Sequence, residues 1–127
     1  MEFNPQFYDH EVVQKTPQDY REMNISPEKI LNCWQSSMFA CEILDKSGNI
    51  KSEDEMAPET LKKYLDAIEM IKRGEDIPKP VLGIGLMDNI EIGIGREIIA
   101  AAANLNLPNI PLHIRNAQAE DIQKVLK

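Results

Sequence analysis

The chain has 127 residues, of which 43% are hydrophobic, and its formal net charge is −7. A chain of this length and composition is typical of one globular domain that buries a hydrophobic core. Its acidic balance, with an isoelectric point of about 4.8, lacks the basic surface that duplex DNA requires, so we expect no tight binding to duplex DNA.

The sequence shows no membrane, export or metal-binding pattern. No apolar run approaches the roughly 18 to 20 residues that a membrane-spanning helix needs. The first residues carry neither the basic nor the apolar segment of a signal peptide. We therefore predict a cytoplasmic protein that does not contact a membrane. The spacing of Cys33 and Cys41 matches no zinc motif, which predicts free thiols and no metal site.

Residues 1–24 are polar and mixed in charge, and Val12-Val13 is their only aliphatic pair. We predict an N-terminal arm here, lying across the domain or a neighbouring subunit or partly disordered, and a domain proper at residues 25–127. The aromatic residues of the arm lack interleaved basic residues, so they favour packing anchors over base stacking. These aromatic residues are Phe3, Phe7, Tyr8 and Tyr20.

A helix is predicted to begin at Pro27 and to continue toward Trp34. Ser26 is a favoured N-cap residue, and proline is a favoured first helical residue. Residues 38–44, MFACEIL, predict a strand, and residues 45–49, which include a glycine, predict a turn after it.

Residues 58–72 predict an amphipathic helix, because their apolar positions recur at helical spacing. These positions are Leu61, Tyr64, Leu65, Ile68 and Ile71. Gly74 is expected to end the helix, and residues 75–80, with two prolines, predict an extended connector.

Residues 81–86 and 90–94 are two short runs rich in β-branched residues, which predict a β-hairpin with a three-residue loop at 87–89. This register gives one wholly apolar face, so burial favours it. The predicted pairs are Leu86 with Ile90, Ile84 with Ile92 and Leu82 with Ile94.

The opposite face of the predicted hairpin is almost bare backbone, because it carries Gly83, Gly85, Glu91 and Gly93. Glycines there suit the close packing of a helix or a strong twist of the strands. They also suit a floor on which a flat ligand or a phosphate lies. Both interpretations stay open at the level of sequence.

An alanine-rich helix is predicted from Arg96 to Asn104, directly after Gly95, followed by a strand at residues 110–114 and a terminal helix at 117–126. The N–H groups at a helix start suit an anion. Arg96 adds positive charge there, whereas Glu97 would repel an anion. Together these elements predict an α/β (α+β) fold, a small single domain with a mixed sheet.

One set of positions runs from the glycine at this helix start to the last strand: Gly95-Arg96-Glu97, Ala101-Ala102, Leu107, Ile110-Pro111 and Ile114-Arg115. The pattern resembles the second conserved box of the ParB/sulfiredoxin-like superfamily. That box has a glycine, polar or charged residues, a helix with paired alanines, and Ile-Pro before a strand. The helix at 58–72 and its closing glycine are similar to the segment upstream of this box, and the resemblance covers residues 25–115.

The resemblance implies binding of a phosphate at the helix start. ParB-type members hold the phosphates of a nucleotide with Gly-Glu-Arg-Arg, and sulfiredoxins have Gly-Cys-His-Arg with a nucleophilic cysteine. This chain has Gly95-Arg96-Glu97-Ile98. Because Arg96 replaces the cysteine, sulfiredoxin chemistry is excluded at this position. Because Ile98 replaces the last arginine, binding of a phosphate depends on Arg96.

We therefore expect a nucleotide, with or without Mg²⁺, or another phosphate-bearing small molecule as ligand, and we assign no catalytic residue. One alternative is a non-catalytic module for protein interaction or homo-oligomerisation that has lost the site. Another is an enzyme that processes nucleic acid like a nuclease or hydrolyses nucleotides. The predicted ligand-binding residues are Gly83, Gly85, Gly93, Gly95, Arg96 and Glu97.

Overall fold

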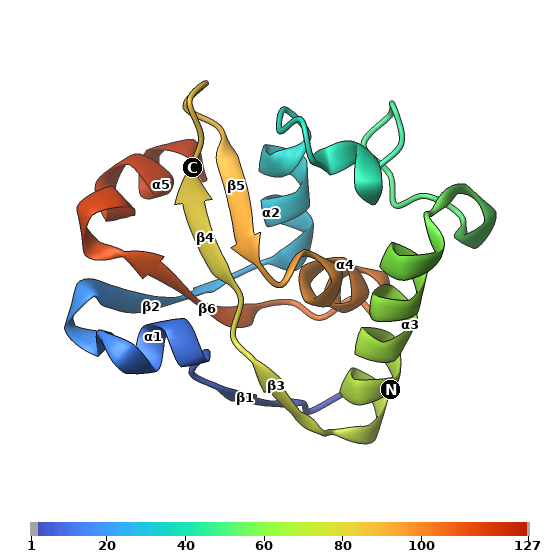
Figure 1. The fold of residues 1–127 in the computed structure, drawn as a ribbon, viewed down its shortest axis with the longest axis horizontal. Coiled ribbons are helices and arrows are strands. Elements are labelled where there is room, and N and C mark those ends of the chain that lie inside the picture. Colours follow the sequence, from blue (N-terminus) through green and yellow to red (C-terminus); the bar gives the residue numbers. More distant parts are fainter. Residues whose placement is uncertain (1–2, 127) are drawn as a thin grey trace.

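The computed structural model, which describes residues 3–126, contains a four-stranded sheet, a two-stranded sheet and helices packed on the larger sheet (Figure 1). The larger sheet is mixed, because its two inner strands are parallel and each outer strand is antiparallel to its neighbour. The predicted α+β class with a mixed sheet is therefore confirmed. In sheet order the strands are β2 (Tyr20–Ile25), β6 (Ile110–Arg115), β4 (Val81–Ile84) and β5 (Ile90–Ile94).

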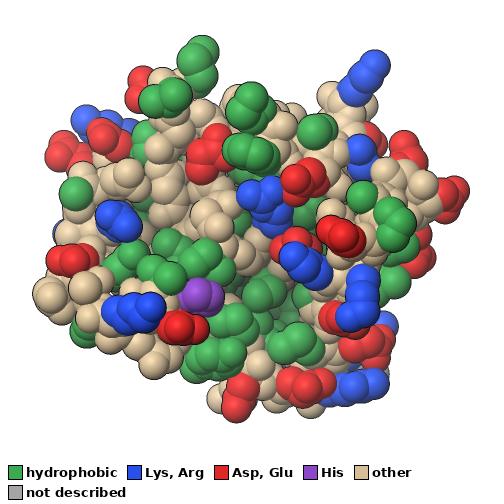
Figure 2. Space-filling model, in the orientation of Figure 1, with side chains coloured by type: hydrophobic (Ala, Val, Ile, Leu, Met, Phe, Trp, Pro, Cys, Tyr) green, Lys and Arg blue, Asp and Glu red, His purple; other side chains and the backbone are tan. Residues whose placement is uncertain are grey.

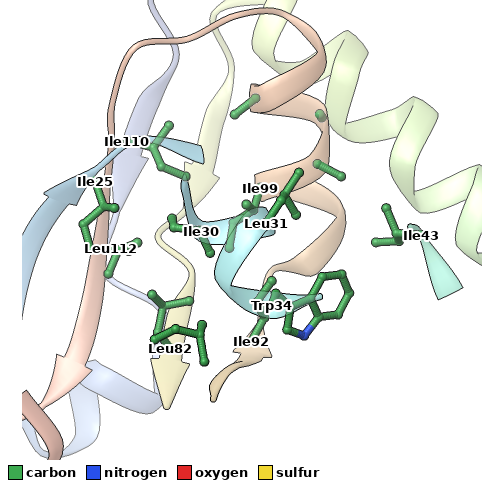
Figure 3. Close-up of a cluster of buried hydrophobic side chains, with 14 of the residues drawn as sticks. Ile25, Ile30, Leu31, Trp34, Ile43, Leu82, Ile92, Ile99, Ile110 and Leu112 are labelled. Carbon is green, nitrogen blue, oxygen red and sulfur yellow. The ribbon is translucent and has the colours of Figure 1, made fainter. Parts of the chain in front are cut away.

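The main core lies between this sheet and two helices, α2 (Pro27–Trp34) and α4 (Arg96–Asn104). Figure 3 shows side chains of β2, β4, β5 and β6 meeting those of both helices. A long helix, α3 (Pro58–Arg73), packs on the outside of α4 (Figure 1). Since α4 has neighbours on two sides, its small side chains allow close approach, and Ala100, Ala101 and Ala102 are fully buried.

Several predicted boundaries are confirmed. The Lys29 N–H donates to Ser26 Oγ at 3.3 Å, so Ser26 caps α2 as expected. Helix α3 ends at Gly74, which has a left-handed φ of 68°. The C-terminal helix, α5 (Ala119–Val125), follows a 3-10 turn and buries Ile122. Local capping and turn chemistry were sufficient to locate these ends.

The N-terminal segment contributes one strand to each of the two sheets. Strand β1 (Gln6–Tyr8) pairs in parallel with β3 (Asp76–Pro78), and the short helix α1 (Glu11–Lys15) buries Val13. Residues 20–24 belong to β2, so the boundary predicted at residue 25 falls inside a strand of the main sheet. Residues 1 and 2 of the predicted arm, and residue 127, lie outside the described residues.

The strand predicted at residues 38–44 is wrong. This segment forms turns and a 3-10 helix, Ala40–Glu42. Its buried residues are Ala40, Ile43 and Leu44, while Met38 and Phe39 are exposed. Burial at intervals of three and four residues is helical, and a strand would instead have buried alternate residues.

The predicted hairpin register is wrong by two residues. Ile84 pairs with Ile90 and Leu82 with Ile92, with an irregularity between Val81 and Leu82. The turn is longer than predicted, because the Gly85 N–H donates to the Asn89 carbonyl oxygen at 2.8 Å and closes residues 85–89. A shift of two residues preserves which side chains share a face, so Leu82, Ile90 and Ile92 are buried as expected, while Ile84 and Ile94 are half-buried. Leu86, predicted to pair, instead lies in the turn.

Among the described residues, no helix combines the length and the apolar character needed to cross a bilayer.

The packing of α4 against two helices predicts a steep cost for enlarging it. Ala101→Leu should lower the free energy of unfolding by about 1–3 kcal/mol, because the added methyl groups have no space. Ala103→Leu in the same helix is the matched control, since this alanine is half-buried. Urea unfolding of both variants measures the difference, and equal midpoints would contradict tight packing of α4.

Candidate functional site

A cleft of about 610 Å³ lies between the turn of the β4–β5 hairpin and residues 36–39, which follow α2. Gly85 and Gly93 form part of its lining. Four large apolar side chains also line it and are exposed to solvent. They are Met38 (80% exposed), Phe39 (47%), Leu86 (105%) and Met87 (83%). We call these four residues the apolar rim.

The hairpin creates this cleft because it extends beyond the rest of the sheet. Figure 1 shows the β4–β5 connection projecting past the other strands, beside the end of α2. In Figure 2, hydrophobic side chains stand at this end of the molecule, and a second group of hydrophobic side chains surrounds the histidine lower on the same face, among charged side chains of both signs. A cluster of exposed apolar side chains is costly in water and commonly marks a binding surface.

Glu91 ties the hairpin to the segment after α2. Its Oε1 accepts a hydrogen bond from Ser37 Oγ at 2.6 Å, and its Oε2 accepts one from Asn89 Nδ2 at 2.9 Å. Gly85 leaves room for this group, because a Cβ there would come within 2.7 Å of Asn89 Oδ1 and 3.0 Å of Glu91, and these side chains would have to shift. The half-buried carboxylate of Glu91 is thus held by two neutral donors.

Arg96 lies at the edge of the same cleft, but its charge is already paired. Its Nη1 is 2.6 Å from Glu42 Oε2. The guanidinium carbon lies 5.3 Å from the centre of the Phe39 ring and 5.8 Å from that of Trp34. These contacts attach the 3-10 helix Ala40–Glu42 to the start of α4. An incoming anion would have to displace Glu42 from the guanidinium.

The start of α4 is partly covered. Gly95 precedes the helix with a left-handed φ of 90°, and no side chain caps the helix there. A Cβ on Gly95 would come within 3.0 Å of Pro80, so this proline packs against the glycine. Glu97 follows in the first turn with a second negative charge, and it does not line the cleft.

The structure therefore divides the six residues predicted to bind a ligand. Gly85, Gly93 and Arg96 line one cleft. Gly83 faces Gln118, whose Oε1 would lie 3.4 Å from an added Cβ, and Gly95 faces Pro80. The apolar rim was missed by the sequence analysis, because residues 38 and 39 were assigned to a strand and residue 86 to a strand pair.

A second cluster of polar side chains holds the N-terminal segment on the sheet. Lys79 Nζ is 2.8 Å from Asp9 Oδ1 and also donates to Glu22. His113 Nε2 lies 3.8 Å from the same oxygen of Asp9, and the histidine is buried. These four residues come from four separate segments, so no local motif could have revealed them.

This cluster offers carboxylate and imidazole groups that could ligate a metal, since one ligand atom each from Asp9, Glu22 and His113 lie within 4.8 Å of one another. The ammonium group of Lys79, however, contacts both carboxylates. A metal ion would have to compete with this bound cation. We therefore interpret the cluster as an attachment of the N-terminal segment.

The environment of the cluster shifts the pKa values of its members. The hydrogen bond from Lys79 lowers the pKa of Asp9. Burial lowers the pKa of Lys79, but hydrogen bonds to Asp9 and Glu22 outweigh it and raise that pKa overall. Burial lowers the pKa of His113, and its Nδ1 is buried without a hydrogen-bond partner in the described part of the chain.

Comparisons with models of protein families, with curated proteins and with solved structures found no match for this chain. The ParB/sulfiredoxin-like resemblance therefore stays a prediction.

The low pKa of His113 predicts that acid weakens the fold. The unfolded chain binds a proton on this histidine near its ordinary pKa of 6.5, whereas the folded chain does so only at lower pH. The contribution of the neutral His113 to the free energy of unfolding is therefore present above about pH 6.5 and is lost as the pH drops below that value. Asp9, whose folded pKa is also lowered, extends the loss to below about pH 4.

Urea unfolding between pH 7.5 and 5, spaced at intervals of about half a pH unit, measures this dependence. His113→Gln should flatten the decline, whereas His10→Asn, which changes the half-buried histidine that caps α1, should keep it. An unchanged pH slope in His113→Gln would contradict the assignment.

Proposed function

We propose that this protein is a non-catalytic binding module that recognises a protein partner through the cleft at the end of the β4–β5 hairpin. The observation that carries the proposal is the apolar rim, in which four large side chains are exposed around one cleft. Covering such a surface removes apolar area from water and so favours association. The two methionines suit this role, because their flexible side chains adapt to different partner surfaces.

The polar groups of the cleft support binding more than catalysis. Both oxygens of Glu91 accept hydrogen bonds from neutral donors, and Arg96 is paired with Glu42. General acid–base catalysis needs a group that is free to exchange a proton with a substrate. The polar groups of this cleft instead hold its own walls in place.

The N-terminal segment is a less favourable site for an intermolecular contact. Its strand β1 pairs with β3 of the same chain, and Asp9 binds Lys79. These contacts are intramolecular. We therefore place the partner at the cleft and not on this segment.

The apolar rim predicts which substitution abolishes binding. Random peptides displayed on phage should yield binders when they are selected on the wild-type protein. These binders should lose about tenfold or more in affinity for Leu86→Ser, because removing a buried leucine contact costs over ~1 kcal/mol. Leu65→Ser, which changes an exposed leucine on α3, is the matched control and should leave affinity unchanged.

Leu86→Ser should keep the urea midpoint of the wild type, since Leu86 is fully exposed. Leu65→Ser should remain folded with a somewhat lower midpoint, because Leu65 is 37% exposed and lies inside α3. A selection that returns no binders, or binders that are equally tight on Leu86→Ser, would overturn the proposed module.

Binding of a nucleotide is a second candidate, and one observation favours it. Gly85, Gly93 and Arg96, all predicted to bind a phosphate-bearing ligand, line the same cleft as the ring of Phe39, on which a base could stack. The ion pair between Glu42 and Arg96 disfavours nucleotide binding, because it neutralises the guanidinium. A nuclease-like function has less support, because Glu91 is the one carboxylate residue found to line the cleft and both its oxygens accept hydrogen bonds from neighbouring side chains.

Calorimetric titration with ATP and with CTP, each with and without Mg²⁺, separates this candidate from the first. If a phosphate binds Arg96, Glu42→Gln should bind nucleotide more tightly than wild type, and Arg96→Ala should lose binding. No detectable heat for all three proteins would remove the nucleotide candidate.

A further inference from the structure

The cleft contains a negative charge that has no cation beside it. Glu91 lines the cleft and is half-buried. Its hydrogen-bond donors, Ser37 and Asn89, are neutral. No ion pair found within residues 3–126 involves Glu91, although nine ion-pair contacts occur there, counting every lysine, arginine or histidine contact with a carboxylate.

The remaining charges around the cleft do not balance this one. Arg96 is the cation that lines the cleft, and Glu42 neutralises it at 2.6 Å. Asp88 lies in the exposed hairpin turn beside Met87, and no ion pair among the described residues includes it. Two carboxylates, from Glu91 and Asp88, are therefore left uncompensated next to the apolar rim.

A carboxylate beside apolar walls interacts with a cation more strongly than one that is fully surrounded by water. The net charge of −7 on the whole chain adds a long-range attraction for positively charged partners and repels acidic ones. The local carboxylate and the net charge of the chain therefore both favour a positively charged partner at this cleft.

From these charges we infer that the cleft takes a cationic apolar segment of a partner protein, in which large apolar side chains flank a lysine or an arginine. This inference rests on the proposed binding module and adds the chemistry of its partner. The apolar side chains cover Met38, Phe39, Leu86 and Met87, and the cation pairs with Glu91. A second copy of this chain is disfavoured as occupant, because two such clefts facing each other would bring their carboxylates together.

To test this inference, the phage-displayed peptides whose binding requires Leu86 are sequenced. We expect lysine and arginine to be enriched in them relative to the starting library. Binding of a selected peptide should weaken about tenfold in Glu91→Gln, because the partner's cation loses its counter-charge. It should also weaken with rising salt concentration.

Glu97→Gln is the matched control, since it removes the same charge from the first turn of α4, outside the lining of the cleft. It should have little effect. Because Glu91→Gln also alters the hydrogen bond to Ser37, Asp88→Asn provides a second variant, for which we expect a smaller loss of affinity and a weaker salt dependence.

Each other result has a definite meaning. Leu86-dependent peptides that are neutral or acidic would overturn the inferred charge while leaving the binding module intact. Equal losses in Glu91→Gln and Glu97→Gln would show that net charge acts and would overturn the assignment to Glu91. The lack of any Leu86-dependent peptide would overturn the binding module itself.

Discussion

The pair of hydrogen bonds that Glu91 accepts is the interaction on which the cleft depends. Ser37 lies just after α2 and Asn89 lies in the hairpin turn, so one carboxylate joins two elements that are distant in sequence. With these elements joined, Gly85 and Gly93 form part of the lining and the exposed apolar side chains line both sides. The same carboxylate supplies the charge that we assign to partner recognition.

The structure gives Arg96 a different role from the one that the sequence predicts. By sequence alone it is the cation at a helix start that suits a phosphate. In the fold its guanidinium lies against Trp34 and Phe39 and binds Glu42. It thus positions the 3-10 helix next to the cleft. This contact explains why we rank recognition of a protein segment above binding of a nucleotide.

Helix starts and ends set by capping residues could be predicted, whereas the local strand at residues 38–44 and the hairpin register were predicted wrongly. Contacts between distant residues could not be predicted. Ser26-Pro27 located the start of α2, and the alanine-rich run after Gly95 located α4, because these signals are local. The partner of Arg96, by contrast, is Glu42, which is far away in the sequence. The Asp9–Lys79–Glu22 contacts likewise depend on segments that only the fold brings together.

We propose that a partner binds at the hairpin end. The most direct measurement is a ¹⁵N NMR titration of the wild-type protein with a selected lysine-bearing peptide. We expect the largest amide shifts at residues 36–39 and 85–93. Shifts concentrated on α1 or on the N-terminal strand β1, with the hairpin unchanged, would contradict this claim.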